Sequence, residues 1–297
     1  MKKIKKEWIF HLMLIPGVLV TFIFHYLPML GISMAFLDYK PAMGFAKADW
    51  VGLQNFYEIF NNPNFFRALR NTVIIAGAKI VLGLVVPVFL ALMLNEIRHS
   101  WYKRIAQTIV YFPHFISWVL MAGIAVDILS PVDGIVNRTL NTLGLESIYF
   151  LGDNSWARFA IIVTDLWKNV GWGTIVFLAA LTGIDLNLYE AAAIDGAGRI
   201  KQLWHITLPG IVPTIVLVGT LSLGNVLNAG FDQIYNLMNG VTMETLDIID
   251  TLVYRLGFEN GGYSISTAAG LFKSVISSFF VILSYKLADR FAGYRIF

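Results

Sequence analysis

Two strongly apolar stretches are joined by the segment YEAAAIDGAGRIKQLWHITLPGIVP, residues 189–213. The segment is rich in alanine and glycine and is partly charged. Asp185 suits the N-cap of a short helix over residues 186–194, and Gly196 suits its end. A second short helix is expected over about residues 198–206, after which a proline suits the first turn of the next apolar stretch. The pattern predicts a helix-turn-helix that projects from the apolar segments and presents small side chains.

The rest of the chain is strongly apolar. Of its 297 residues, 57% are hydrophobic and 14% are charged, which is far too apolar for a soluble globule. The formal net charge of +3 is small and argues against a nucleic-acid partner. Because the sequence contains no cysteine, disulfides, thiolate catalysis and cysteine-based metal sites are excluded. We therefore expect an integral membrane protein in contact with lipid.

Six stretches are long enough to cross a bilayer as helices, which requires about 20 residues each. They cover residues 8–36, 72–94, 105–129, 159–182, 209–227 and 265–287. The first is too long for the apolar region of a secretory signal, so it is expected to remain as a span. The predicted fold class is an all-α, polytopic transmembrane helix bundle, with one membrane domain over residues 1–297.

The distribution of basic residues predicts the orientation. Lysine and arginine are more frequent in the connections that face the cytoplasm if the N-terminus lies inside, beginning with MKKIKK at residues 1–6. By the positive-inside rule, both termini are expected in the cytoplasm. On the outer side, WVGLQNFYEIFNNPNFFRALRNT at residues 50–72 is expected to form an amphipathic helix at the membrane interface.

The sequence predicts no catalytic residue. It contains no phosphate loop of the form G-x-x-x-x-G-K followed by Ser or Thr, so ATP hydrolysis would require a separate subunit. The five histidines are scattered without an i, i+4 pair, so no metal site is expected. No set of serine, histidine and acid, or pair of acids, stands in a recognisable catalytic context. The chain is therefore not expected to be an enzyme.

Ionisable residues inside spans are costly and usually face a bundle interior or a watery cavity. In this sequence they are Lys79, Asp165, Lys168 and Lys273. In the fourth span the candidates for lining a substrate path are Asp165, Trp167, Lys168, Asn169 and Trp172. The fifth span is expected to contribute Asn225 and Asn228 on one helical face. Amides, charges and aromatic planes match the hydroxyl rim and C–H faces of a sugar. Each candidate also has a purely structural interpretation. Asp165 and Lys168, three residues apart, can form an ion pair, the tryptophans can lie at the membrane interface, and the asparagines can bridge helices.

Several motifs resemble those of ATP-binding-cassette importer permeases. The sequences EAA at 190–192, DGA at 195–197 and LP at 208–209 resemble the EAA loop of that superfamily. The sequences GWGTIVFLAALTGIDLNLYEAA at 171–192 and PGVLVTFIFHYLPMLGISMAFLDYKP at 16–41 are similar to first permease subunits of its carbohydrate-uptake branch for complex polysaccharides or oligosaccharides. The resemblance covers almost the whole chain.

This resemblance implies a binding-protein-dependent type I importer permease fold in a bacterial cytoplasmic membrane. It implies a cytoplasmic coupling loop at about 184–209, in which the residues that dock in a groove of an ATPase are Glu190, Ala191, Ala192, Asp195, Gly196 and Ala197. The implied partners are a second homologous permease, a cytoplasmic ATPase dimer that binds ATP and Mg²⁺, and an extracellular solute-binding protein that delivers an oligosaccharide. No cofactor is expected on this chain itself.

Other functions compatible with the residues are a permease of the same type for another solute, such as a peptide or an ion, and an ion-coupled secondary transporter. In the second alternative, Asp165 and Lys168 would serve ion coupling. The absence of internal repeats and the complete coupling motif count against it. The loop at 184–209 also has a simpler interpretation, as a well-capped cytoplasmic connection with no partner.

Overall fold

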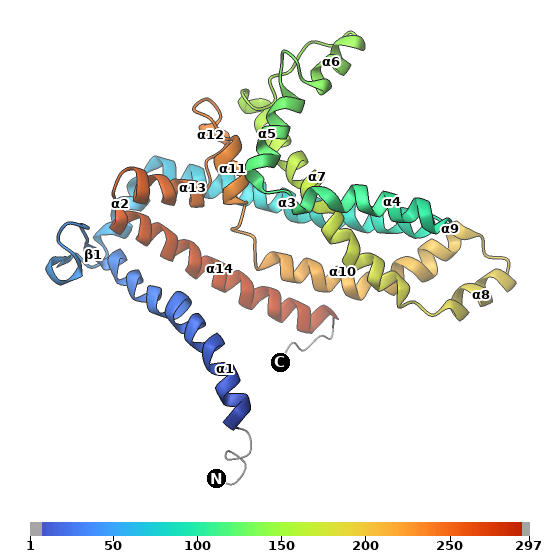
Figure 1. Cartoon of the computed structure of the whole chain (residues 1–297), viewed down its shortest axis with the longest axis horizontal. Helices are drawn as coiled ribbons and strands as arrows, with labels where there is room; N and C mark the ends of the chain where they lie inside the picture. The colour runs from blue at the N-terminus through green and yellow to red at the C-terminus, as the bar shows by residue number, and fades with distance from the viewer. Residues whose placement is uncertain (1–7, 293–297) are drawn as a thin grey trace. The chain divides into compact units, whose positions relative to one another are not determined.

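The computed structural model describes residues 8–292, whose elements are drawn in Figure 1. The chain divides into two compact units. Of the described residues, the first unit contains 8–65 together with 252–272, and the second contains 66–251 together with 273–292. Three helices, α3 (Pro63–Glu96), α13 (Ile249–Tyr254) and α14 (Tyr263–Ala292), contribute residues to both units.

The first unit begins with a long apolar helical stretch that ends in a small hairpin. Its elements are α1 (Trp8–Thr21), the π-helical η1 (Phe22–Tyr26), the 3-10 helices η2 (Leu27–Phe36) and η3 (Phe45–Lys47), the strands β1 (Leu37–Asp38) and β2 (Asp49–Trp50), α2 (Gln54–Asn61) and the π-helical η6 (Arg255–Glu259). The strands pair antiparallel, with Leu37 opposite Trp50. This two-residue hairpin is a minor addition to an otherwise helical fold.

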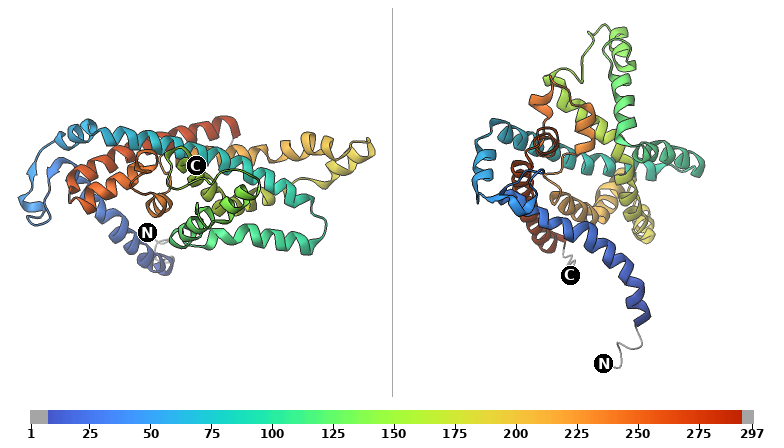
Figure 2. Two further views of the ribbon diagram at one scale, coloured as in Figure 1. Left: turned by 90° about the horizontal axis from the view of Figure 1, so that it is seen from above. Right: turned by 60° about the vertical axis from the view of Figure 1, so that its left-hand side comes forward.

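The second unit is helical in the described residues. After α3 come α4 (Ser100–Tyr111), η4 (Phe112–Phe115), α5 (Trp118–Leu129), α6 (Ile135–Thr142), α7 (Asn154–Thr182), α8 (Leu186–Ile194), α9 (Arg199–Gln202), η5 (Leu203–Thr207), α10 (Leu208–Leu223), α11 (Phe231–Leu237), α12 (Met243–Leu246) and α13 (Ile249–Tyr254). In Figure 2, α8 and α9 form the turn that joins the ends of α7 and α10.

Five described helical stretches are long and apolar enough to cross a membrane. They are Phe10–Phe36, Pro63–Glu96, Asn154–Thr182, Arg199–Leu223 and Tyr263–Arg290. A sixth candidate is a bent pair, Ser100–Phe115 followed by Trp118–Leu129, whose halves meet at 110°. The predicted all-α, six-span bundle is confirmed, with its third span broken rather than straight.

The break in the third span has local causes. Pro113 at the start of η4 cannot continue an α-helical ladder, because its ring removes a donor. Ser117 then caps the next helix, since its Oγ accepts a hydrogen bond from the backbone N–H of Leu120 at 3.4 Å. The chain between these two residues therefore leaves one helix and begins another.

The core of the second unit lies between α3, α5, α7 and α11, where small residues let the helices approach. Ala76, Ala125 and Ala160 pack there beside Ile161 and Ile234, all of them buried. Large apolar residues elsewhere are mostly exposed, and in the first span no residue of the apolar window is buried. That pattern is opposite to a soluble globule and suits helices whose outer faces contact lipid.

The expectation for residues 50–72 is wrong in its detail. The segment forms two helices, because α2 ends at Asn61 and α3 begins at Pro63. Asn62 is extended, as residues before a proline usually are, and its side chain accepts a hydrogen bond from the N–H of Asn64 at 3.0 Å. The second half is therefore the start of the 34-residue helix α3 rather than part of one amphipathic helix.

Candidate functional site

The loop between α7 and α10 is built from local capping interactions. The Asp185 carboxylate accepts a hydrogen bond from the N–H of Asn187 at 3.0 Å and so begins α8. At the other end, the Gly196 N–H bonds to the Ala193 carbonyl at 3.1 Å, and the Ala197 N–H bonds to the Ala192 carbonyl at 2.8 Å. These two hydrogen bonds form the pattern of a Schellman cap. The residue at this position of the cap must have a left-handed backbone, and Gly196 has a φ of 75°.

The outer face of this loop is open. Glu190, Ala191, Asp195 and Gly196 are exposed, and Ala192 and Ala197 are half-buried. Large apolar side chains stand beside them, since Ile194 is 86% exposed and Ile200 and Trp204 are also exposed. A capped, rigid turn that presents small and apolar side chains together is suited to a protein partner.

The second half of the loop differs from the prediction. Instead of a separate helix over 198–206, the helical turn α9 continues through the π-helical η5 into α10, so that residues 199–223 form one helical stretch. The Tyr189 hydroxyl lies 2.9 Å from the buried Thr207 Oγ1 and so joins α8 to the last residue of η5. The expected proline in the first turn of α10 is present at Pro209.

Lys168 lies at the break in the third span. Only 7% of this residue is exposed, and its Nζ donates to the carbonyl oxygens of His114 at 2.7 Å and Ile116 at 2.5 Å, with Pro113 at 3.4 Å. The Pro113 carbonyl also accepts the backbone N–H of Ile116 at 3.2 Å, whereas the carbonyls of His114 and Ile116 lie at the 110° bend, where the helical ladder is interrupted. The ammonium therefore compensates the broken ladder, and the Trp118 ring, with its centroid 5.6 Å from Nζ, adds a cation–π contact.

Two further predicted residues lie at the same break. Asn169 Oδ1 is 3.2 Å from His114 Nδ1, and the indole of Trp172 stacks on the His114 ring with centroids 4.9 Å apart and planes at 10°. Trp172 is 55% exposed, so its ring is accessible beside the break. His114 had no expected role in the sequence, and its partners belong to a helix more than 50 residues away.

Asp165 pairs with α3 rather than with Lys168. Its carboxylate lies 3.1 Å from Lys79 Nζ, which also donates to the Ala229 carbonyl at 2.7 Å and to the side chain of Gln233. Gln233 is completely buried and donates in turn to Thr164 Oγ1 and the Ile161 carbonyl. The pair is thus part of a hydrogen-bonded network that joins α3, α7 and α11.

A hollow of about 280 Å³ opens beside this ion pair. Asp165, Lys79, Ser222, Asn225 and Asn228 contribute its polar lining. It can offer hydroxyl, amide, carboxylate and ammonium groups to a polar solute. Of the sequence candidates, this hollow brings together Asp165, Asn225 and Asn228.

The sequence predicts that Asn225 and Asn228 share a helical face, but in the structure they do not lie on a helix. The helix α10 ends at Leu223, and both Asn225 and Asn228 are exposed in the turns that follow. Trp167 is also separate from this hollow. It lines a second, wholly apolar hollow of about 260 Å³ with Phe159 and Val163.

Sequence reasoning missed several residues of the network. Gln233 and Ser222 carry no sequence signal, because their roles depend on residues distant in the chain. Lys79 was recognisable as a lysine within an apolar span, a position that usually marks an interior. Among residues 8–292, no group of three or more histidine or acidic side chains could hold a metal ion.

The described residues thus form a helical bundle with several candidate membrane spans and a capped, exposed loop between the fourth and the fifth, an arrangement that suits a membrane permease. The family of binding-protein-dependent transport system inner membrane components matches residues 83–293, which is more than two thirds of the chain. The chain belongs to this family. It is the permease component of an ATP-binding-cassette importer and does not itself catalyse ATP hydrolysis.

Relatives and solved structures are similar over nearly the full length. Protein LplB of Bacillus subtilis strain 168 is 45% identical, over 98% of this chain and 92% of its own. The polygalacturonan/rhamnogalacturonan transport system permease protein YteP of the same strain is 40% identical, over 100% and 92%. A chain of a bacterial alginate transporter in complex with an alginate pentasaccharide-bound periplasmic protein is 40% identical over 99% of both chains, with a TM-score of 0.91.

Proposed function

We propose that this permease carries oligosaccharides or polysaccharide fragments. The similarity of 40% over 99% of the chain to the alginate transporter carries this proposal. The named cargo of the relative YteP is also a uronate-containing polysaccharide. The hollow beside Lys79 and Asp165 supports it, because its amides, hydroxyl and charges match the hydroxyl groups of a sugar.

The site residues divide into two groups in this proposal. Glu190, Ala191, Ala192, Asp195, Gly196 and Ala197 form the surface that docks in a groove of the ATPase. Asp165, Asn225 and Asn228 line the path, while Trp172 and Asn169 border it at the break. Lys168 acts indirectly there, by fixing the backbone that these two side chains flank.

The working transporter contains other subunits in this proposal. They are a second homologous permease, an ATPase dimer that binds ATP and Mg²⁺, and an extracellular protein that delivers the saccharide. Both termini of the present chain, and the loop at about 184–209, face the cytoplasm. An ion-coupled mechanism is disfavoured, because Lys79 already neutralises Asp165 at 3.1 Å and members of this family depend on binding proteins.

The decisive experiment is ATP hydrolysis by the reconstituted complex. Binding proteins loaded with neutral or uronate-containing oligosaccharides are added in turn, and the unloaded proteins serve as the control. We expect stimulation by at least one loaded saccharide. If peptides or inorganic ions on their binding proteins stimulate hydrolysis and no saccharide does, the proposed cargo is wrong.

A further inference from the structure

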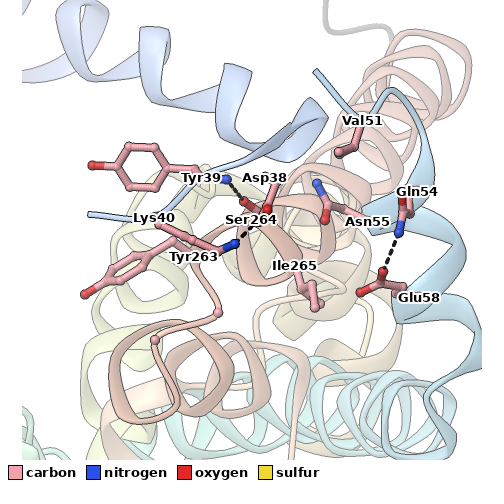
Figure 3. Close-up of a pocket in the computed structure, with 12 residues that line it drawn as sticks. Asp38, Tyr39, Lys40, Val51, Gln54, Asn55, Glu58, Tyr263, Ser264 and Ile265 are labelled. Atoms are coloured by element: carbon pink, nitrogen blue, oxygen red, sulfur yellow. Dashed lines mark hydrogen bonds and ion pairs between the residues drawn. The ribbon is translucent and has the colours of Figure 1, made fainter. Parts of the chain in front are cut away.

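A separate polar hollow lies within the first unit, as Figure 3 shows. It has a volume of about 480 Å³, within the range of roughly 300–1,000 Å³ that small-molecule sites occupy. The hairpin, α2 and the first turn of α14 form its walls. It shares no lining residue with the hollow beside Lys79 and Asp165.

Hydrogen bonds hold the walls of this hollow in place. The Asn55 side chain is 6% exposed and donates to the carbonyl oxygens of Ala35 and Leu37, at 3.0 Å each, which joins α2 to the hairpin. The Tyr39 N–H donates to Ser264 Oγ at 2.9 Å, which joins the hairpin to α14. A site whose walls are fixed before binding loses little conformational freedom on binding.

The polar lining retains capacity for a ligand. Asp38 accepts a hydrogen bond from Lys40 at 2.9 Å, and Glu58 accepts one from Gln54 at 3.1 Å. A carboxylate has about four acceptor positions, so each group can accept further hydrogen bonds from hydroxyls. The hydrogen bond to Asp38 raises the pKa of Lys40, so the lysine is an ammonium at neutral pH. With the carboxylates of Asp38 and Glu58, the lining then has a net negative charge.

Apolar and aromatic groups complete the lining. Val51 and Ile265 contribute aliphatic surface. The rings of Tyr39 and Tyr263 meet edge to face at 6.2 Å, and in Figure 3 they lie on the opposite side of Ser264 from Gln54 and Glu58. The lining therefore offers both hydrogen-bond acceptors and carbon surface, which correspond to the rim and the faces of a pyranose.

We propose that this hollow binds an uncharged sugar unit of the transported saccharide, at a site distinct from the Lys79–Asp165 hollow. The inference rests on the proposed carbohydrate cargo. Neutral sugars are favoured over uronates, because the net negative lining repels a ligand carboxylate. The residues that decide this preference are Asp38 and Glu58, which accept hydrogen bonds from the sugar.

Photocrosslinking of the assembled transporter tests this site. The complex is placed in nanodiscs without binding protein or ATP and is exposed to a neutral oligosaccharide that carries a diazirine group. We expect labelled peptides from residues 38–58 and 261–265, with competition by unlabelled neutral sugar that is stronger than competition by an oligogalacturonate. Glu58→Gln should reduce the labelling about tenfold, because it replaces a charged acceptor of a hydroxyl by a neutral one.

The matched control is Glu146→Gln, the same change at an exposed position outside the hollow. The extent of labelling at the hollow should be the same in this control variant as in the parent protein. Labelling only at other peptides, equal loss in both variants, or better competition by the uronate would overturn the inference. Stimulation of hydrolysis by saccharide-loaded binding protein is measured on the same preparation. If no saccharide stimulates hydrolysis, the proposed cargo fails; stimulation without labelling here refutes this site alone.

Discussion

Lys168 Nζ lies 2.5 Å from the carbonyl oxygen of Ile116, at the point where the third span turns by 110°. The two residues come from different spans, and the contact connects α7 to the first of the two residues between η4 and α5. A lysine in a span is usually explained by a solute or an ion path. Here its donors are directed at backbone carbonyls at the bend, where the helical ladder is interrupted, which is a structural reason for a buried charge.

Replacing Lys168 by Met should lower the folding stability of the permease rather than remove a contact with the transported solute. The change keeps most of the side-chain volume but leaves the carbonyls of His114 and Ile116 without their donor, at a cost of about 1–3 kcal/mol for each buried group. We expect a lower midpoint of thermal unfolding in detergent and less assembled complex. Lys47→Met, at an exposed position, is the control. Parental stability of Lys168→Met, with reduced transport, would instead support a path-lining lysine.

The Lys79–Asp165 pair should show strong coupling in a double-mutant cycle. Lys79→Met leaves a carboxylate near the protein interior without its cation, and Asp165→Asn leaves the ammonium without its anion. The double variant removes both charges and should be more stable than the sum of the single effects predicts, by about 1–3 kcal/mol. Thermal unfolding of the four proteins measures this coupling. Additive effects would show that solvent screens the pair.

Gly171→Ala should be poorly tolerated. A Cβ at this position would lie 2.2 Å from the Val110 carbonyl oxygen, so α7 and α4 would have to move apart. Overpacking of this kind costs about 1–3 kcal/mol. Gly77→Ala is the control, because a Cβ there meets nothing within 4 Å and alanine favours the helix. We expect a lower unfolding temperature for the first variant only, measured by fluorescence in detergent.

Gly196→Val should impair coupling to the ATPase. A side chain at φ 75° is strained by about 1 kcal/mol, and a branched one would also obstruct the docking face. Gly198→Val is the matched control, because a Cβ there also meets nothing within 4 Å but φ is −71°. We expect loss of substrate-stimulated hydrolysis and of ATPase co-purification for Gly196→Val alone. Normal coupling in both variants would contradict the assignment of the loop.

Glu190→Lys tests the charge of the same surface without backbone strain. The side chain is exposed on α8, so the change should spare membrane insertion and pairing with the second permease. We expect the ATPase to dissociate more readily, because a docking surface that presents an acid would then present a base. Co-purification at two salt concentrations measures this. Failure of insertion would support the simpler interpretation of the loop as a structural connection.

The sequence predicted α8 to the residue, and the reason is that its limits are local. Asp185 caps the helix through the N–H of Asn187, and Gly196 ends it through bonds to carbonyls within five residues. Such signals lie within one or two turns and can be recognised in a single sequence. The positions of the spans were likewise predicted from hydropathy, since length and apolar composition suffice.

The partners of the buried charges could not be predicted. Lys168 contacts carbonyls 52 to 55 residues away, and Lys79 lies against Asp165 on another helix. Hydropathy records how apolar a segment is, not the direction in which it runs, so the size of the bend after Pro113 was also undetermined. The asparagines were placed on a helical face because α10 was assumed to continue past Gly224, where it ends.

The two ends of the loop between α7 and α10 differ in structure. On the α7 side, residues 183–185 are non-helical, and the side chain of Ile184 lies against Gly210 of α10. On the other side, residues 199–223 are one helical rod of roughly 37 Å at 1.5 Å per residue, and Tyr189 fastens α8 to it through Thr207. A force applied to α8 would therefore reach α10 directly, through the contact between Tyr189 and Thr207. The far end of α10, at Leu223, immediately precedes Asn225 and Asn228, which line the hollow beside Lys79 and Asp165. A displacement of the loop would therefore be carried along the fifth span and would change the lining of that hollow.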